Sequence, residues 1–252
     1  MMDTEKKLIQ AQAELDRTCK EYEAFLYAIS HDLGAPIRHI NSFSQIILES
    51  QGDQFDEKTR HYFQFVIEGG KQLNEMLAAL LTLSRLNTQK RPFEQTDISE
   101  IIATLQSGKL AEEFETRKAS LVVEKLPIIS ADGDQIALLF EALLSNALKF
   151  QVEGTMPKIH ISAEADDGQW RFRIEDNGIG LEPKYAESVF GIFKKANATG
   201  KYPGTGIGLT IAEKIVVRHG GTIRILPAKT QGTIVEFELN SNPPQEMGQL
   251  DN

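Results

Sequence analysis

The sequence predicts an α + α/β protein of two parts, a long helical hairpin followed by an α/β sandwich. The first observation is the heptad spacing of apolar residues over about residues 5–87, without the alternation that marks strands. The second is a change after residue 91, where helical and β-rich segments alternate. We expect separate domains over residues 1–91 and 92–241, and a disordered tail over 242–252.

The composition of the 252 residues is that of an ordinary globular protein, with 41% hydrophobic and 25% charged residues. A net charge of −9 argues against a nucleic-acid or anionic-membrane binder, because such surfaces need an excess of Lys and Arg. No apolar run approaches the ~18 to 20 residues that a membrane-spanning helix needs. The only cysteine, Cys19, excludes an intrachain disulfide and a Cys-rich metal site, which fits a reducing cytoplasm.

The N-terminal half predicts two long helices joined by a turn at residues 51–53. In each helix, apolar residues recur at the steps of three and four that form a seam between packed helices. One hairpin cannot bury such stripes alone, so we expect two chains to pair as a four-helix bundle. A monomeric hairpin packed on the second half is the alternative. The seam residues are Leu8, Leu15, Tyr22, Phe25/Leu26, Ile29 and Leu33 in the first helix, and Tyr62, Val66, Gly69, Leu73, Met76, Leu80 and Leu83 in the second.

The middle of the first helix carries a His-Asp pair, His31 and Asp32. His31 is two residues from Ile29, about 200° around the helix, so its imidazole is expected to point away from the seam. Asp32 can bind one imidazole nitrogen and accept its proton, which leaves the other nitrogen as a nucleophile. Pro36 removes a helical hydrogen bond and predicts a local kink. An exposed histidine beside a solubilising aspartate is the alternative interpretation.

The second half predicts interleaved helices and strands. Residues 182–203 form a stretch too long for an ordinary connector, which predicts a lid or a binding loop. The expected helices cover residues 97–115 and 133–150, and the expected strands cover 121–125, 158–165, 169–175, 221–226 and 233–239.

Asn146 lies among the apolar residues of the second of these helices. A buried carboxamide without partners costs about 1 to 3 kcal/mol, so this side chain needs a ligand or a hydrogen bond. Its oxygen can ligate Mg²⁺, and Lys149 lies one turn on, where it can reach a phosphate. A helix cap or a core hydrogen bond is the alternative for Asn146.

Two glycine motifs flank the predicted lid. Residues 176–180, Asp-Asn-Gly-Ile-Gly, follow a strand, and residues 204–209, Gly-Thr-Gly-Ile-Gly-Leu, precede a helix. Alternate glycines let backbone N–H groups face a phosphate at a helix N-terminus. The Rossmann and P-loop spacings are both absent. Asp176 can accept a hydrogen bond from the exocyclic amine of a purine.

In this order the segments resemble the sequence boxes of sensor histidine kinases, over about residues 22–239. The phosphoacceptor segment is most similar to the phytochrome-linked, cyanobacterial subgroup. The resemblance implies a dimerising phosphoacceptor hairpin and an ATP-binding module of the GHKL type found in gyrases and chaperones. The boxes are matched by His31, by Asn146, by Asp176 to Gly180, by the aromatic residues 190–193 and by residues 204–209.

The resemblance also implies a role for each matched residue. His31 would receive the γ-phosphoryl group of ATP with Asp32 as the base, and the group would then pass to an aspartate of a response regulator. ATP and Mg²⁺ are the implied cofactors, and a hinge near residues 91–92 would let the ATP module reach His31. Asn146 would hold Mg²⁺, Lys149 would contact phosphate, Phe150 would pack near adenine, Asp176 would bind the adenine amine with help from Gly178 and Gly180, and Gly204, Gly206 and Gly208 would line the phosphates.

Two positions depart from the family pattern. Ala142 stands where members often carry a second asparagine, which implies weaker metal or phosphate contacts. Ala35 stands where members with phosphatase activity often carry Thr or Asn, which puts that activity in doubt. An ATP hydrolase or clamp of the same type is disfavoured, because Glu141 is one residue, about 100°, from the position of the water-activating glutamate. A scaffold with a vestigial ATP module is supported only by Ala142.

Overall fold

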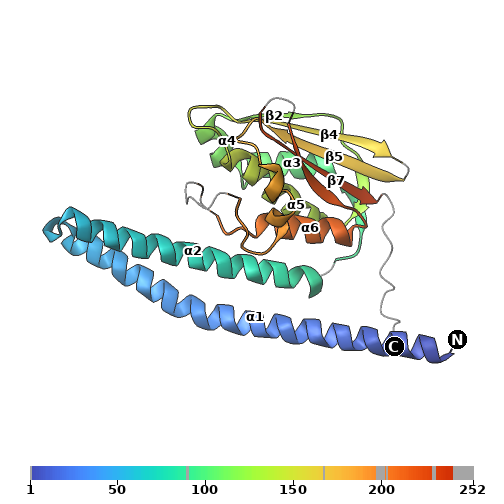
Figure 1. Ribbon diagram of the computed structural model, residues 1–252, viewed down its shortest axis with the longest axis horizontal. Helices are drawn as coiled ribbons and strands as arrows, with labels where there is room; N and C mark the ends of the chain where they lie inside the picture. The colour runs from blue at the N-terminus through green and yellow to red at the C-terminus, as the bar shows by residue number, and fades with distance from the viewer. Residues whose placement is uncertain are drawn as a thin grey trace. The chain divides into compact units, whose positions relative to one another are not determined.

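The computed structural model divides into two compact units, Met1–Gln89 and Lys90–Asn252. It describes residues 2–88, 91–166, 168–196, 202, 204–228 and 231–240 (Figure 1). The predicted tail over residues 242–252 and the side chains of Leu8 and Leu15 lie outside this description.

The first unit is the predicted hairpin of two long helices. Helix α1 (Met2–Gln51) and helix α2 (Glu57–Thr88) are joined by the short 3-10 helix η1 (Gly52–Gln54). Asp56 caps the start of α2, because its carboxylate accepts a hydrogen bond from the Thr59 amide at 2.8 Å. Helix α1 stays helical through Pro36.

Small and mid-sized side chains line the contact between α1 and α2. Gly70 lies directly under the Asn41 side chain, where any Cβ would collide with the carboxamide. The absence of a side chain at this position therefore lets the two helices approach closely. Among the hairpin residues whose burial the structure describes, the buried ones are Ser30, Gly34, Ile37, Ser44, Ile67, Leu77, Leu83, Ser84 and Leu86.

Most of the predicted seam lies on other faces of the two helices. Tyr22 and Leu33 of α1 are 58% and 46% exposed, and Tyr62 and Val66 of α2 are 55% and 46% exposed. The exposed part of the predicted seam therefore does not join α1 to α2, whereas Leu83, near the end of α2, is buried. Each helix carries a second apolar face, which one hairpin does not cover. Its other large exposed members are Phe25, Ile40, Phe43, Ile46, Ile47, Phe65 and Leu73.

The second unit is an α/β sandwich, with its helices on one face of a five-stranded sheet (Figure 1). The strand order is β2-β4-β5-β7-β6; β2 pairs with β4 in parallel and the other pairs are antiparallel. The strands are β2 (Ser120–Val123), β4 (Lys158–Asp166), β5 (Gln169–Asp176), β6 (Ile223–Pro227) and β7 (Thr233–Asn240). The helices are α3 (Ile98–Ser107), α4 (Ala111–Arg117), α5 (Gly133–Lys149) and α6 (Gly208–Arg218).

A cluster of three buried aromatic rings fastens α5 to the sheet. The ring of Phe140 on α5 lies 6.0 Å from that of Phe172 on β5 and 5.7 Å from that of Phe237 on β7. The two sheet residues stack on each other at 5.1 Å. Offset and edge-to-face pairs of this kind add to the energy of burial. The cluster fixes the helix that carries Asn146.

The structure confirms the interleaved pattern and changes it in two places. The helix expected over residues 97–115 breaks near Gly108 into α3 and α4, and the buried side chain of Leu110 fills the corner. Two short strands were not predicted, β1 (Glu94–Asp97) and β3 (Ile128–Ala131), which pair antiparallel with each other. Strands of four residues are too short to show a clear alternation. Within the described part of the chain, no helix is both long and apolar enough to cross a membrane.

Candidate functional site

His31 lies on α1 with its imidazole in solvent, as its spacing from the seam predicts. The side chain is 74% exposed, and Nδ1 lies 3.1 Å from Oδ1 of Asp32. A carboxylate can only accept, so Nδ1 carries the hydrogen and Nε2 keeps a free lone pair. The Tyr27 ring, one turn earlier, stacks at 6.4 Å from the imidazole. The arrangement therefore presents Nε2 as a nucleophile.

Asn146 of α5 faces the start of α6. A Cβ placed on Gly208 would lie 3.9 Å from Nδ2 of Asn146 and 3.8 Å from Cβ of Ala142. The carboxamide of Asn146 makes no hydrogen bond with any residue that the structure describes, so the alternative of a cap or core hydrogen bond is not observed. A half-buried amide oxygen beside a helix start can serve as a ligand for a hard cation.

Lys149 ends α5 beside the second glycine motif. A Cβ on Gly204 would stand 2.6 Å from Nζ of Lys149, so glycine leaves the room that the ammonium needs. The same Nζ lies 4.5 Å above the ring of Phe150, which in turn lies 5.3 Å from the ring of Tyr202. The Tyr202 hydroxyl donates to the carbonyl oxygen of Gln151 at 3.2 Å. A cation and two aromatic rings thus gather at the end of α5.

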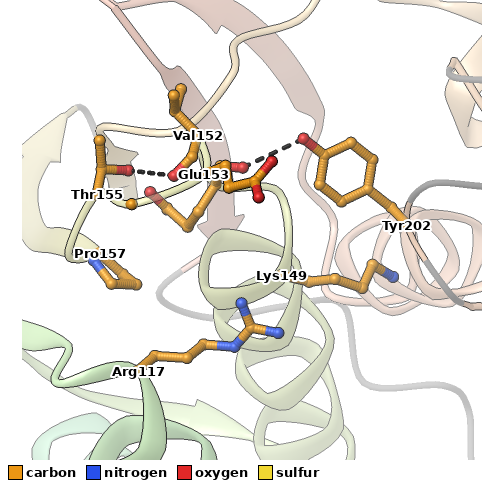
Figure 2. Close-up of a pocket in the computed structure, with 9 residues that line it drawn as sticks. Arg117, Lys149, Val152, Glu153, Thr155, Pro157 and Tyr202 are labelled. Atoms are coloured by element: carbon orange, nitrogen blue, oxygen red, sulfur yellow. Dashed lines mark hydrogen bonds between the residues drawn. The ribbon is translucent and has the colours of Figure 1, made fainter.

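A cavity of about 410 Å³ opens at this end of α5 (Figure 2). Lys149 and Tyr202 line it, and Arg117, the last residue of α4, reaches into it from the other side. Two cationic side chains, those of Arg117 and Lys149, line the cavity together with one carboxylate, that of Glu153. This positive balance favours the binding of an anion. No sequence motif surrounds Arg117, so only the packing of α4 beside α5 brings it here.

Asp176, the last residue of β5, is a half-buried carboxylate with one oxygen committed to the backbone. Its Oδ1 accepts from the amides of Gly178 at 2.8 Å and Thr233 at 3.3 Å. Burial raises the pKa of Asp176 to about 6, while the two backbone hydrogen bonds act in the opposite direction. Among the described residues nothing donates to Oδ2. This second oxygen can accept from an amine of a ligand.

The first glycine motif lies against the end of α5. A Cβ on Gly178 would collide with the carbonyl oxygen of Phe150, and that oxygen accepts from the Ile179 amide at 3.0 Å. Gly180 has a φ of +74°. Gly232, at φ +116°, passes so close to the backbone of Asp176 that only glycine fits. In the sequence, Gly232 is a lone glycine before a strand, which indicates only an ordinary turn.

The second glycine motif leads into the N-terminus of α6. Gly206 has a φ of +75°. A Cβ placed on it would lie 3.0 Å from the carbonyl oxygen of Lys194. Thr210 donates from its hydroxyl to the carbonyl oxygen of Phe190 at 2.7 Å, which ties the aromatic segment to α6. The free N–H groups of a helix start can bind an anion. Residues 197–201 and 203 of the predicted lid lie outside the described residues.

The fold therefore collects most of the predicted site residues at the facing ends of α5, β5 and α6. His31 and Asp32 belong to the other unit. The residues collected in the second unit are Asn146, Lys149, Phe150, Asp176, Gly178, Gly180, Gly204, Gly206 and Gly208.

Two family descriptions match this chain. Residues 22–89 match the His Kinase A (phospho-acceptor) domain, and residues 131–243 match the histidine kinase-, DNA gyrase B- and HSP90-like ATPase. Together they cover the helical hairpin and the site-bearing part of the α/β unit.

The relatives are histidine kinases and phytochromes. Cyanobacterial phytochrome A of Nostoc sp. is 30% identical over 233 residues, 92% of this chain and 30% of the relative. Cyanobacterial phytochrome B of the same organism is 33% identical over 238 residues, 92% of this chain and 31% of the relative. The chain thus spans about a third of the length of these relatives.

A solved structure shares the fold. The histidine kinase ThkA, in complex with response regulator protein TrrA, superposes with a TM-score of 0.61 at 20% identity, over 92% of this chain and 66% of that chain. The exposed imidazole on the hairpin agrees with the phospho-acceptor match, and the GHKL-type sandwich agrees with the ATPase match. This chain belongs to the sensor histidine kinase family.

Proposed function

We propose that this chain is an ATP-dependent protein-histidine kinase that phosphorylates itself on His31 and passes the group to an aspartate of a response regulator. The observation that carries the proposal is the pairing of two sites. One is an exposed imidazole whose Nδ1 is held by Asp32. The other is the group of Asn146, Lys149 and Asp176 around the glycine motifs of the second unit.

The reaction follows from the state of the imidazole. The lone pair on Nε2 of His31 forms a bond to the γ-phosphorus, while the bond from that phosphorus to the bridging oxygen breaks and ADP leaves with its electrons. The ring gains positive charge, and Asp32, which already accepts from Nδ1–H, stabilises that charge and can take the proton. Such phosphoryl transfer depends mainly on positioning, since its transition state is loose.

The second unit would bind the nucleotide through three kinds of contact. Oδ2 of Asp176 accepts from the adenine amine, and Phe150 packs against the base. Lys149 and the start of α6 bind the phosphates. The free amide oxygen of Asn146 fits Mg²⁺, which would neutralise charge on the phosphates when bound. Among the described residues, no three His, Cys, Asp or Glu side chains are grouped to hold a metal.

The proposed partners are a second copy of this chain and the receiver domain of a response regulator. The second apolar face of α1 and α2 supports dimerisation, because a large exposed apolar patch is the mark of an interface. We propose a cytoplasmic location, which the need for ATP and the presence of a single cysteine support.

The structure disfavours ATP hydrolysis as the main activity. Glu141 is the carboxylate nearest to the place of a water-activating glutamate, but its Oε2 lies 2.8 Å from Nζ of Lys109 in an ion pair. The side chain that faces the start of α6 at Gly208 is instead the methyl group of Ala142. Among the described residues, the atoms that face Gly208 belong to Ala142 and Asn146, and neither residue has a carboxylate that could act as a base for water.

We expect His31→Ala to abolish self-phosphorylation while ATP still binds. With Mg-ATP, the wild-type chain should acquire a phosphoryl group that is labile in acid and stable in base, because it is carried on nitrogen. The variant should lose at least ~100-fold of this rate, as expected when the nucleophile is removed. The control is His39→Ala, an exposed histidine on the same helix. Label that persists in His31→Ala would remove His31 from the mechanism.

We expect Asp176→Asn to lose at least ~10-fold in ATP affinity, measured by calorimetry. The amide oxygen can keep the two backbone hydrogen bonds, but the amide nitrogen replaces the oxygen that would accept from adenine. ATP affinity of the wild type should also fall as the pH drops below about 6, where the carboxylate becomes protonated.

The same substitution should stabilise the unit at pH 8, which serves as the control for folding. The pKa of Asp176 is raised in the folded chain, so the stability that its protonated form contributes is lost as the pH rises through about 6. An asparagine side chain does not ionise, so the variant does not lose stability as the pH rises. The melting temperature of Asp176→Asn should therefore exceed that of the wild type at pH 8 and equal it near pH 4. Unchanged ATP affinity in a folded variant would show that the adenine assignment is wrong.

We expect Ala142→Asn to lower the Mg²⁺ concentration needed for half-maximal self-phosphorylation by about 3-fold or more. The new carboxamide would lie one turn before Asn146, facing the same glycine. Ala137→Asn, on another face of α5, is the matched control and should change nothing. An equal Mg²⁺ dependence in the wild type and Ala142→Asn would show that the residue at position 142 does not contribute to metal binding.

We expect Val66→Glu to weaken dimerisation by at least ~10-fold, measured by sedimentation. The variant puts a charge in the middle of the exposed apolar face of α2, and burying an unpaired charge is costly. Val122→Glu, on the exposed side of β2, carries the same change on the other unit and should leave the assembly intact. A wild-type chain that stays monomeric at micromolar concentration would favour the hairpin packed on its own second unit.

A further inference from the structure

Along helix α1, the surface beside His31 is open on one side only. Residues three and four positions apart are neighbours on the surface of a helix. Before His31 these neighbours are Ala28 and Tyr27, and the Tyr27 ring stacks at 6.4 Å from the imidazole. After His31 they are Gly34 and Ala35, which carry no side-chain atom beyond a methyl group. A group attached to the imidazole therefore meets no bulky neighbour of its own helix on the C-terminal side.

The guanidinium of Arg38 lies over this open surface. A Cβ placed on Gly34 would stand 3.0 Å from Nη1 of Arg38. Apart from the helix backbone and the two chain neighbours of Gly34, no other described residue comes within 4 Å of that position. Glycine is less favourable than alanine inside a helix, so the residue is explained here by the room that it leaves for the guanidinium.

His31 and Arg38 share one face of α1. Seven residues correspond to about 700° of rotation, which is about 20° short of two full turns. The guanidinium reaches back one turn to Gly34, in the direction in which helical side chains point. Cβ positions three residues apart on a helix lie about 5–6 Å from each other, so Nη1 of Arg38 is within about 9 Å of the His31 Cβ. At this separation the long arginine side chain can contact a phosphoryl group on Nε2.

Arg38 has no competitor among the lysines and arginines of the hairpin. It is the only Lys or Arg in residues 21–57. The imidazole lies ten positions before Asn41, which meets Gly70 of α2, so α2 is level with the imidazole about ten positions after Gly70. This part of α2, residues 72–84, contains no Lys or Arg. Within one hairpin, Arg38 is therefore the one permanent cation near the phosphoacceptor.

A phosphoryl group on His31 needs such a cation. It carries a charge of about −1.5 to −2 at pH 7, and the neighbouring carboxylate of Asp32, 3.1 Å from Nδ1, repels it. The Arg38 side chain is exposed and makes no hydrogen bond or ion pair with any residue that the structure describes. Its planar guanidinium can donate two parallel hydrogen bonds to phosphoryl oxygens.

We propose that Arg38 binds the phosphoryl group that His31 carries, through charge-assisted hydrogen bonds from its guanidinium. The inference rests on the proposed function, because it concerns the phosphorylated state of His31. The contact acts while the bond from Nε2 to phosphorus forms, and it then stabilises the phosphorylated side chain. Arg38 is thus a further catalytic residue, and Gly34 is the positioning residue that leaves space for its guanidinium.

The first test phosphorylates His31 in the full chain without ATP. Potassium phosphoramidate is the donor: Nε2 attacks its phosphorus, and ammonia leaves with the electrons of the P–N bond. In ³¹P NMR spectra, the signal that is missing in His31→Ala belongs to His31, and its pH titration gives the pKa of the phosphorylated side chain. A nearby cation disfavours protonation, so we expect this pKa to rise by about 0.5 in Arg38→Gln at 0.15 M salt.

The matched control is Lys20→Gln. It removes the same charge from the same helix, but eleven residues before His31, about 16 Å along the axis. The pKa of phosphorylated His31 should not change in this variant. Arg38→Lys keeps the charge without the planar fork, and we expect it to show less than half of the rise seen in Arg38→Gln.

The second test measures self-phosphorylation with Mg-ATP. We expect Arg38→Gln to lower the rate at saturating ATP by about 10-fold, as for the loss of one charge-assisted contact. The affinity for a non-hydrolysable ATP analogue should stay within twofold of the wild type. Gly34→Leu fills the space of the guanidinium and should lower the rate in the same way, while its melting temperature stays at or above that of the wild type, since leucine favours the helix.

An equal pKa of phosphorylated His31 in the wild type and Arg38→Gln would overturn the proposal, whatever happens to the rate. Failure of phosphoramidate to label His31 would also overturn it, because Nε2 would then not be an accessible nucleophile. A different result separates the two proposals. If the pKa differs between wild type and Arg38→Gln but ATP never labels the wild-type chain, the contact with Arg38 stands and the proposed kinase function is wrong.

Discussion

The candidate site depends on one close backbone contact, between the end of α5 and the first glycine motif. The carbonyl oxygen of Phe150 accepts from the Ile179 amide at 3.0 Å, and Gly178 leaves room for this approach. Any side chain at position 178 would push the two segments apart. Because Asn146 and Lys149 lie in the last turn of α5, the same contact places them beside Asp176. The stacked rings of Phe140, Phe172 and Phe237 hold the other end of this arrangement rigid.

The two chemical halves of the proposed reaction sit in opposite environments. Asp176 is half-buried, and the resulting pKa of about 6 leaves it ionised at neutral pH yet costly to keep charged. This cost is offset when a ligand donates to its free oxygen. His31 lies in solvent, where its contact with Asp32 contributes little stability and mainly orients the ring. Burial favours the role proposed for Asp176, which is to bind a ligand. His31, as the proposed nucleophile, must instead stay accessible to both ATP and a protein partner.

The hairpin buries only part of its apolar side chains between α1 and α2. Small or polar residues such as Ser30, Ser44 and Gly70 let α1 and α2 approach, while large residues such as Phe43 and Tyr62 remain on the outer faces. The proposed second copy would cover the exposed apolar side chains. The heptad pattern therefore describes an exposed surface more than the contact within one chain.

Local patterns in the sequence were sufficient for the hairpin, for the five strands of the main sheet and for the motifs around His31, Asn146 and Asp176. Periodicity and glycine spacing act over a few residues, so they survive without knowledge of the fold. The positions of Arg117 and Gly232 and the contacts of Arg91 came only from the tertiary structure. Each joins segments far apart in the chain, as Arg91 and Arg218 do across 127 positions. Such contacts are decided by how helices and strands pack, and no local spacing encodes them.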